Sequence, residues 1–345
     1  MLTMSSLTSR NHRRYPLTTS ALMLAFALAG CTDKGEKDVR IVPPPVTEPE
    51  PPEPEGPTQA EIREARAERN RAANRVAATR VSAVSQTQQN YYAEVERKLL
   101  DGNRLRLDRT PIDAPIDAET LAQNFIQIAL HDEYGSDGKR HADGASAPLR
   151  RWQQPVHVDL EFGPSSDTAL KQEIRSEVAA FADRLEQITG HSVKLTDGTG
   201  NFTMLVLNDE ERRDISARLP DLAPGIPAQD IAALRDLSPD IYCTVFAYSK
   251  GASTSYAHAV AVIRAELPPL LRLSCVHEEM AQGMGLANDS PEARPSIFND
   301  DEEFALLTRH DELLLQILYD PRLRPGMSEA EAAPVVRKIA GELLP

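Results

Sequence analysis

The chain has 345 residues, a formal net charge of −14 and three cysteines. A strongly acidic chain repels the phosphates of nucleic acids and of anionic lipid surfaces, so we exclude both as partners of its soluble part. After residue 30, no apolar run is long enough to span a bilayer.

The N-terminus has the pattern of an export signal. Three arginines precede an apolar stretch, residues 17–28, which is too short to remain as a membrane-spanning helix. The stretch ends in Leu28-Ala29-Gly30-Cys31, which resembles the bacterial lipobox. We therefore predict cleavage of residues 1–30 and attachment of diacylglycerol to the thiol of Cys31. Two acyl chains and an acylated amino terminus suffice to hold the mature chain on a membrane.

The cysteines and the residue after the lipobox indicate a compartment. Thr32 follows Cys31, and resemblance to the sorting rules of Gram-negative lipoproteins implies the outer membrane, with the body of the protein in the periplasm. This compartment is oxidising, and Cys243 and Cys275 are the two cysteines left after lipidation. We therefore expect them to form a disulfide.

Residues 31–57 are predicted to form a disordered, lipid-anchored stalk. The segment 41–57 reads IVPPPVTEPEPPEPEGP. Its prolines remove backbone hydrogen-bond donors and its glutamates repel one another, which favours an extended tether.

Residues 58–116 are predicted to form a long helix and a connector. Thr58 and Glu61 form a capping-box pattern, and no proline or glycine interrupts the chain from there to Leu100. Apolar residues are too sparse for a coiled coil, so we interpret the helix as a solvated spacer. Contact with the cell wall through its arginines, or pairing with a partner helix, stays open as an alternative.

Residues 117–345 are long enough for one core and are predicted to form a single α/β (α+β) domain. Asp117 is expected to begin a helix, and an Asp- and Gly-rich loop at 135–145 follows. A strand is predicted at 156–162 from its alternation, and a helix at 167–189.

The rest of this domain is predicted to complete a twisted mixed sheet. Further strands are predicted at 191–195, 202–207, 242–248 and 257–264. The last long helix is expected to begin at Pro268 or Pro269 and to end at 283–285, where two glycines stand.

This last helix carries the densest chemistry of the chain. His277 and Glu278 match the start of the zinc-protease motif HExxH. Ala281 stands where the second histidine is required, and its methyl group cannot bind a metal. We therefore assign His277 to a helix face or to the core, with a role as metal ligand as the alternative.

A shift of one residue gives a more complete match. Glu278-Glu279-x-x-Gln282-x-x-Gly285-x-x-Asn288-Asp289 resembles the metzincin signature HExxHxxGxxH/D, with both early histidines replaced. The resemblance implies metal-ligand positions for Glu278, Gln282 and Asn288 or Asp289, a general base in Glu279, and a chain reversal at Gly285.

A second segment supports the same resemblance. Residues 295–300, PSIFND, resemble the metzincin Met-turn, with Phe298 in place of the methionine. The order of strand, helix, strands and helix is also similar to that of zincins. The resemblance therefore implies a zincin-like domain, in which the active-site helix packs on a twisted sheet.

The donor atoms do not suit zinc. Zinc prefers nitrogen and sulfur ligands, whereas oxygen donors suit Ca²⁺, Mg²⁺ or Mn²⁺, and a neutral glutamine amide is a weak ligand. We expect a metal-free site in which Glu278 and Gln282 bond to each other or to nearby backbone. The alternative is an unknown divalent cation, with Glu279 polarising a water as general base.

The order of motifs across the whole C-terminal domain resembles a family of bacterial envelope lipoproteins, domain of unknown function 2927, which brings no activity with it. The residues that carry this resemblance are Glu278, Glu279, Gln282, Gly285, Leu286, Asn288, Asp289, Ser296, Phe298, Asn299, Asp311, Tyr319, Asp320, Pro321 and Met327. We assign the stretch 310–324 to packing, with a helix that ends at Tyr319-Asp320-Pro321, and contact of His310 and Asp311 with the Asn288 loop is the alternative.

Three functions remain open from the sequence. The preferred one is a non-catalytic module that binds an envelope protein or peptide partner. The second is a metal-dependent peptidase with Glu279 as general base. The third is a structural lipoprotein that links the outer membrane to other envelope layers.

Overall fold

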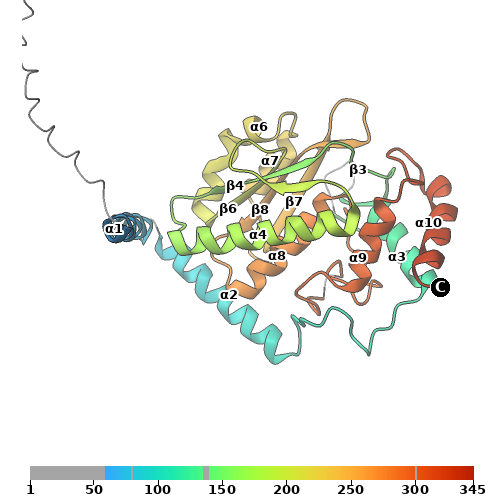
Figure 1. Ribbon diagram of the computed structural model, residues 1–345, viewed down its shortest axis with the longest axis horizontal. Coiled ribbons are helices and arrows are strands. Elements are labelled where there is room, and N and C mark those ends of the chain that lie inside the picture. The colour runs from blue at the N-terminus through green and yellow to red at the C-terminus, as the bar shows by residue number, and fades with distance from the viewer. Residues whose placement is uncertain (1–58, 79–80, 135–139, 300) are drawn as a thin grey trace, which may run out of the picture. The chain divides into compact units, whose positions relative to one another are not determined.

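A six-stranded mixed sheet lies at the centre of the computed structural model, which describes residues 59–78, 81–134, 140–299 and 301–345 (Figure 1). Its strands are β3 (Arg151–Trp152), β4 (Val156–Phe162), β5 (Val193–Leu195), β6 (Phe202–Leu207), β7 (Cys243–Ser249) and β8 (Ser255–Arg264). The chain orders them β5-β4-β6-β8, all parallel, and β7 runs antiparallel to β8 at the edge. Short β3 pairs with the start of β8. The predicted α/β class and mixed sheet are confirmed.

The two faces of the sheet bury different side chains because successive residues of a strand point to opposite sides. In β6, Met204 and Val206 belong to the larger core, which also contains residues of α4 (Thr168–Thr189) and α8 (Pro269–Gly283). Leu205 and Leu207 belong to a smaller cluster under α5 (Asp209–Asp214), α6 (Leu219–Leu222) and α7 (Ala228–Arg235). Helices therefore cover both faces (Figure 1).

The ends of α4 follow the capping pattern of the sequence. Asp167 accepts a hydrogen bond from the backbone N–H of Leu170, and Gly190 closes the helix in the left-handed conformation with φ +66°. A glycine adopts this conformation without the clash that a Cβ would cause. The prediction for 167–189 is confirmed.

A second group of helices packs beside the sheet. It consists of α3 (Ala118–Ala129), α9 (Arg309–Leu318) and α10 (Glu329–Leu343), which contact one another (Figure 1). Asp117 caps α3 as predicted, with a 2.8 Å bond from the backbone N–H of Thr120. Residues of α3 and α10 line the pocket described below.

The loop predicted at 135–145 is in part a β-hairpin. Strand β1 (His131–Tyr134) pairs antiparallel with β2 (Arg140–Ser146). The loop prediction is therefore wrong for 140–145. The loop was predicted from its glycine and aspartate residues. These residue types do not show that the segment pairs with β1.

The single long helix predicted from residue 58 to Leu100 is wrong. The chain forms two helices, α1 (Gln59–Ala78) and α2 (Ala83–Asp101). The side chain of Ser82 accepts a hydrogen bond from the backbone N–H of Ser85 and begins a new helix. An N-cap serine satisfies a donor that a continuous helix would have bonded to its own backbone.

Helix α2 is also not a solvated spacer. Tyr92 is fully buried, and its hydroxyl donates to the carbonyl oxygen of Pro239 at 3.0 Å. Ser85 is buried and donates to Glu266 at 3.1 Å. Helix α2 therefore belongs to the same compact unit, Pro57–Pro345, as the sheet.

Several sequence predictions lie outside the described residues. They are the export signal at 1–30, lipidation of Cys31 and the stalk at 31–57. Among the helices of the described ranges, none combines the length and the apolar character that a membrane crossing needs.

Candidate functional site

The N-terminus of α8 is held by another helix. Pro268 and Pro269 offer no side-chain cap. Instead, Glu96 of α2 accepts hydrogen bonds from the backbone N–H groups of Leu270 at 3.1 Å and Leu271 at 3.0 Å. A carboxylate at a helix N-terminus satisfies orphan donors and is favoured by the helix dipole.

The C-terminus of α8 is fixed by side chains from two other elements. The indole N–H of Trp152 donates to the carbonyl oxygen of Gly283 at 2.7 Å, and the hydroxyl of Tyr319 donates to that of Met284 at 3.0 Å. Gly285 then reverses the chain with φ +127°, and a Cβ there would lie 2.4 Å from the carbonyl oxygen of Arg150. The turn predicted at Gly285 therefore requires glycine.

The loop after this turn is held by both motif amides. Gln282 is buried, and its Nε2 donates to Oδ1 of Asp289 at 3.1 Å. Asn288 is buried, and its Nδ2 donates to the carbonyl oxygen of Gln127 on α3 at 3.0 Å. The structure therefore brings Gln282 and Asp289 together and uses Asn288 to join the loop to α3.

Glu278 and Glu279 lie beside the disulfide. Cys243 of β7 and Cys275 of α8 form the predicted disulfide, with their Cα atoms 5.8 Å apart. Ligand atoms of Cys243, Glu278 and Glu279 all lie within 4.8 Å of one another. The sulfur is bonded in the disulfide, so it is not a thiolate, and two carboxylates remain as oxygen donors.

Of the four predicted ligand residues, Gln282 and Asp289 are hydrogen-bonded to each other, and Glu278 lies with Glu279 and Cys243. In the described part of the chain, the single cluster of histidine, cysteine and carboxylate ligand atoms contains Glu278 and Glu279 but not Asp289. Glu279, the predicted general base, is 2% exposed. A pair of carboxylates with oxygen donors alone would suit a hard cation rather than zinc.

His277 lies on another face of α8. Its ring stacks on Phe181 at a centroid distance of 4.0 Å, and its Nδ1 accepts a hydrogen bond from the backbone N–H of Leu307 at 3.2 Å. Burial and the nearby Arg109 lower the pKa of His277 to about 4. The histidine is neutral at physiological pH and serves packing, as the sequence predicted.

The segment that resembles the Met-turn is organised by Asp311 of α9. This buried carboxylate accepts hydrogen bonds from the hydroxyl of Ser296 at 2.5 Å and from the backbone N–H of Ile297 at 3.2 Å. It also accepts a bond from the backbone N–H of Thr308 at 2.9 Å, within a capping box. Asp311 thus organises the 295–298 turn, and contact with the Asn288 loop stays a prediction.

His310 connects this turn to α3. It is fully buried between Asp311 at 3.3 Å and the side chain of Asn124 at 3.0 Å. Sequence reasoning missed Asn124, Trp152 and Glu96, because each contacts a residue more than one hundred positions away. The sequence offered one signal for these three residues: Trp152 is the single tryptophan of the chain and stands just before a predicted strand.

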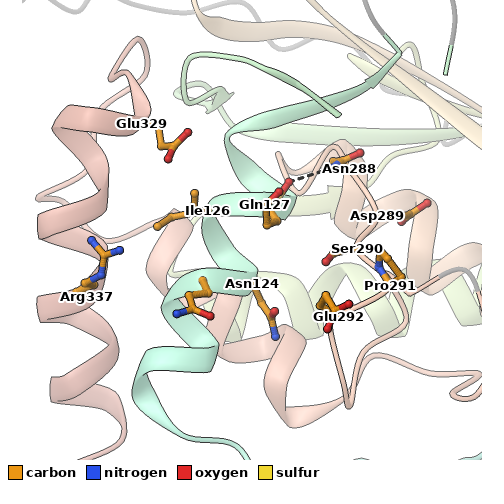
Figure 2. Close-up of a pocket in the computed structure, with 11 residues that line it drawn as sticks. Asn124, Ile126, Gln127, Asn288, Asp289, Ser290, Pro291, Glu292, Glu329 and Arg337 are labelled. Atoms are coloured by element: carbon orange, nitrogen blue, oxygen red, sulfur yellow. Dashed lines mark hydrogen bonds between the residues drawn. The ribbon is translucent and has the colours of Figure 1, made fainter. Parts of the chain in front are cut away.

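A polar pocket of about 590 Å³ opens beside the motif loop. Figure 2 shows α3 between the 288–292 loop on one side and α10 on the other, with the Asn288–Gln127 hydrogen bond at the base of the loop. We call this the amide pocket. Its lining residues are Gln123, Asn124, Ile126, Gln127, Asn288, Asp289, Ser290, Pro291, Glu292, Glu329 and Arg337.

The charge of the amide pocket is negative. Asp289, Glu292 and Glu329 supply three carboxylates against the single guanidinium of Arg337. Arg337 also faces Glu119 at 3.6 Å, which offsets its charge further. Amides and carboxylates together suit a ligand with N–H donors and a positive charge.

Comparison with known proteins extends the sequence resemblance. Residues 118–338 match the family described as "Protein of unknown function (DUF2927)". No curated protein and no solved structure matches the chain. The match spans α3, the sheet, the motif loop and most of α10, so it contains the amide pocket and the disulfide.

Proposed function

Because the chain belongs to the DUF2927 family, whose description carries no activity, we propose a function from the residues of the chain itself. The protein is a lipid-anchored envelope lipoprotein of the outer membrane. Its periplasmic domain is zincin-like, does not catalyse a reaction, and binds a peptide or protein partner in the amide pocket.

The observation that carries this proposal is the hydrogen bond from Gln282 to Asp289. In the metzincin resemblance these positions belong to the metal site. Here the amide nitrogen of Gln282 donates to a carboxylate, and that of Asn288 donates to a carbonyl oxygen. These bonds fix the orientation of both amides, one toward Asp289 and one toward α3, so both side chains serve the shape of the loop.

Support for a zincin-like domain comes from the arrangement of elements. Strand β4, helix α4, strands β5 to β8 and helix α8 follow one another along the chain, and α8 contacts β7 and β8. Gly285 makes the expected reversal after α8. The order of elements and the position of the glycine turn therefore match the resemblance, although Glu278 and Gln282 replace the two histidines.

The chemistry of the amide pocket points to a peptide with a basic group. Three carboxylates attract an ammonium or guanidinium group, and four side-chain amides from α3 and the loop offer both donors and acceptors for peptide groups. The pocket volume falls within the range of natural ligand sites.

Fluorescently labelled basic and acidic tetrapeptides, such as AKKA and AEEA, test this binding site on the purified chain. We expect the basic peptide to bind more tightly, and Glu292→Gln to weaken it several-fold by removing a carboxylate. Glu342→Gln, a change to an exposed carboxylate of α10 outside the pocket, is the matched control. Equal affinities for both peptides, or no effect of Glu292→Gln, would refute the site.

The peptidase alternative rests on Glu278 and Glu279, whose oxygens lie together beside the disulfide. Metal analysis of the purified chain, with Glu278→Ala as control, separates it from the proposal. A binding module predicts no stoichiometric ion and unchanged peptide affinity in Glu279→Gln. A bound ion that Glu278→Ala removes, with peptide cleavage that Glu279→Gln abolishes, would establish the peptidase instead.

The lipid anchor is testable independently of the domain. We expect cells that express the chain to incorporate labelled palmitate into it, and Cys31→Ser to abolish the label. Fractionation should place the wild-type chain in the outer membrane. Label retained in Cys31→Ser would contradict the assignment, whereas changes in the amide pocket should leave it untouched.

A further inference from the structure

A second pocket shares no residue with the amide pocket. Its volume is about 430 Å³, and α4, α8 and residues 306–307 form its walls. We call it the arginine pocket. Its lining residues are Arg109, Ser176, Glu177, Ala180, Phe181, Arg184, Leu273, His277, Leu306 and Leu307.

The walls of the arginine pocket are mostly apolar. Ala180, Phe181, Leu273, Leu306 and Leu307 surround it, while away from the arginines Ser176, Glu177 and His277 are its polar side chains. Burying an apolar ligand in such a cavity is favourable, and the walls offer few hydrogen-bond partners to a peptide backbone.

One side of the pocket has a surplus of positive charge around Glu312. This carboxylate is 3% exposed and pairs with Arg109, with Arg184 through Nε at 3.0 Å, and with Arg309 at 3.4 Å. Three guanidiniums thus share one carboxylate, and two of them, Arg109 and Arg184, line the pocket with Glu177. Burial and the charges of Arg184 and Arg309 lower the pKa of Arg109.

The guanidinium groups remain accessible to a ligand. The side chains of Arg109 and Arg184 are 44% and 40% exposed, although Glu312 itself is buried. A guanidinium has five N–H donors, so each arginine keeps donors beyond those that bond to Glu312. A ligand carboxylate would find two such groups at the pocket.

His277 adds a neutral donor to the same pocket. Its Nδ1 accepts a hydrogen bond from the backbone N–H of Leu307, so the neutral ring carries its proton on Nε2. In the part of the chain that the structure describes, this N–H has no acceptor. A carboxylate oxygen of a ligand would satisfy it.

We propose that the arginine pocket binds a fatty acid, with its carboxylate at Arg109 and Arg184 and its acyl chain along Phe181 and Leu273. An acyl chain of roughly ten carbons suits a cavity at the lower end of the range of ligand pockets. It needs no polar partners along the walls, whereas a peptide of similar size would leave its amides unpaired. This site is independent of the partner binding proposed for the amide pocket.

Isothermal titration of the full chain with decanoate tests the assignment. Decan-1-ol has the same ten-carbon chain without the carboxylate, and acetate has the carboxylate without the long alkyl chain. We expect both to bind at least tenfold more weakly than decanoate. Equal binding of decan-1-ol, tighter binding of N-acetyl-leucyl-leucine, or no decanoate binding at 1 mM would each overturn the proposal.

Matched variants place the ligand in the arginine pocket. Ala180→Trp should fill the cavity and abolish binding, and its exposed position on α4 spares the core. Arg184→Met should weaken binding at least tenfold, and Arg184→Lys should restore part of it. Arg175→Met, on the same helix but paired with exposed Asp197, is the control. Undiminished binding in Ala180→Trp, with far-ultraviolet circular dichroism and the urea unfolding midpoint unchanged, would refute the site.

Discussion

Gln282 shows how one side chain can change the chemistry of a helix while the backbone around it stays the same. Its position in the motif belongs to a metal ligand in the metzincin resemblance, yet its amide bridges α8 to Asp289. A neutral donor and an ionised acceptor form a charge-assisted hydrogen bond, which is stronger than a bond between neutral groups. The loop thus gains an internal bond where a cation would otherwise hold it.

Gln282→Glu should reverse this effect. Two carboxylates would then face each other, and we expect a loss of about 1–3 kcal/mol in the free energy of unfolding at neutral pH. The loss should shrink near pH 4 because one carboxylate takes up a proton and can donate to the other. Urea unfolding at pH 7.5 and pH 4 measures it. Gln282→Leu, which adds no charge, loses the hydrogen bond without the repulsion and should show a smaller deficit than Gln282→Glu at pH 7.5.

His277 makes folding stability depend on pH. Its pKa is about 4 in the folded chain, against an ordinary value of 6.5. Between these values the unfolded chain binds a proton that the folded chain does not, so stability falls as pH falls through this window, by up to about 1.4 kcal/mol per pH unit. Below pH 4 both states are protonated and this loss stops growing.

His277→Gln keeps an acceptor for the backbone N–H of Leu307 but cannot take up a proton. We therefore expect a smaller decrease in stability than the wild type shows between pH 6.5 and pH 4, as measured by urea unfolding at several pH values. Parallel curves for the two proteins would show that His277 does not titrate in this window.

At the scale of elements, α8 is positioned by residues outside itself. Glu96 of α2 bonds to its first backbone donors, while Trp152 of β3 and Tyr319 after α9 bond to its last carbonyl groups. A helix that begins with two prolines and ends at a glycine turn supplies few of these partners. Helix α2 is for this reason part of the support of the site rather than a tether.

Glu96→Ala should lower the free energy of unfolding by about 1 kcal/mol, the usual cost of losing an N-terminal cap. Glu96→Gln keeps an acceptor oxygen and should lose less. Glu94→Ala is the matched control, because Glu94 is exposed on the same helix and pairs with Arg97. Urea unfolding compares the four proteins, and an equal loss in Glu94→Ala would argue against a specific cap.

Across the whole molecule, the disulfide joins the edge of the sheet to α8. Cys243 and Cys275 are separated by 32 residues, a span that contains β8 and the start of α8. The covalent link thus connects the antiparallel edge strand to the helix that carries Glu278 and Glu279. It restricts the unfolded chain and holds β7 beside these carboxylates.

Replacing both cysteines by alanine should lower the free energy of unfolding by about 3–4 kcal/mol, from the loop-closure entropy of such a span. Urea unfolding of the double variant measures this loss. The addition of a reductant to the wild-type chain should reproduce it, and should leave the double variant unchanged. Equal stabilities of the two proteins under oxidising conditions would contradict a constraining disulfide.

The hypothesis of a structural envelope linker needs a different test, because α2 is part of the folded domain. Deleting both α1 and α2 would remove the buried Tyr92 and the Glu96 cap. The domain would then be destabilised, whether or not the helices serve as a spacer. Helix α1 is the proper test, since its described side chains are mostly exposed. A linker predicts an envelope defect on deletion of α1 while the domain stays folded.

Local chemistry explains what the sequence determined by itself. Alternating or continuous apolar residues placed β4 and β6 at their observed bounds, and Asp117, Asp167 and Gly190 marked helix ends correctly. The cysteine count and the expected compartment predicted the disulfide. Each of these signals depends on residue type and short spacing, which a single sequence displays directly.

Only the tertiary structure decided how the candidate site is built. It placed Glu278 and Glu279 beside the disulfide, directed Asp311 to the 295–298 turn, and gave α8 its cap from Glu96. It also brought Arg109 and Arg184 to one buried glutamate. These contacts join segments far apart in the chain, and their partners are set by how the helices pack on the sheet, which no local pattern records.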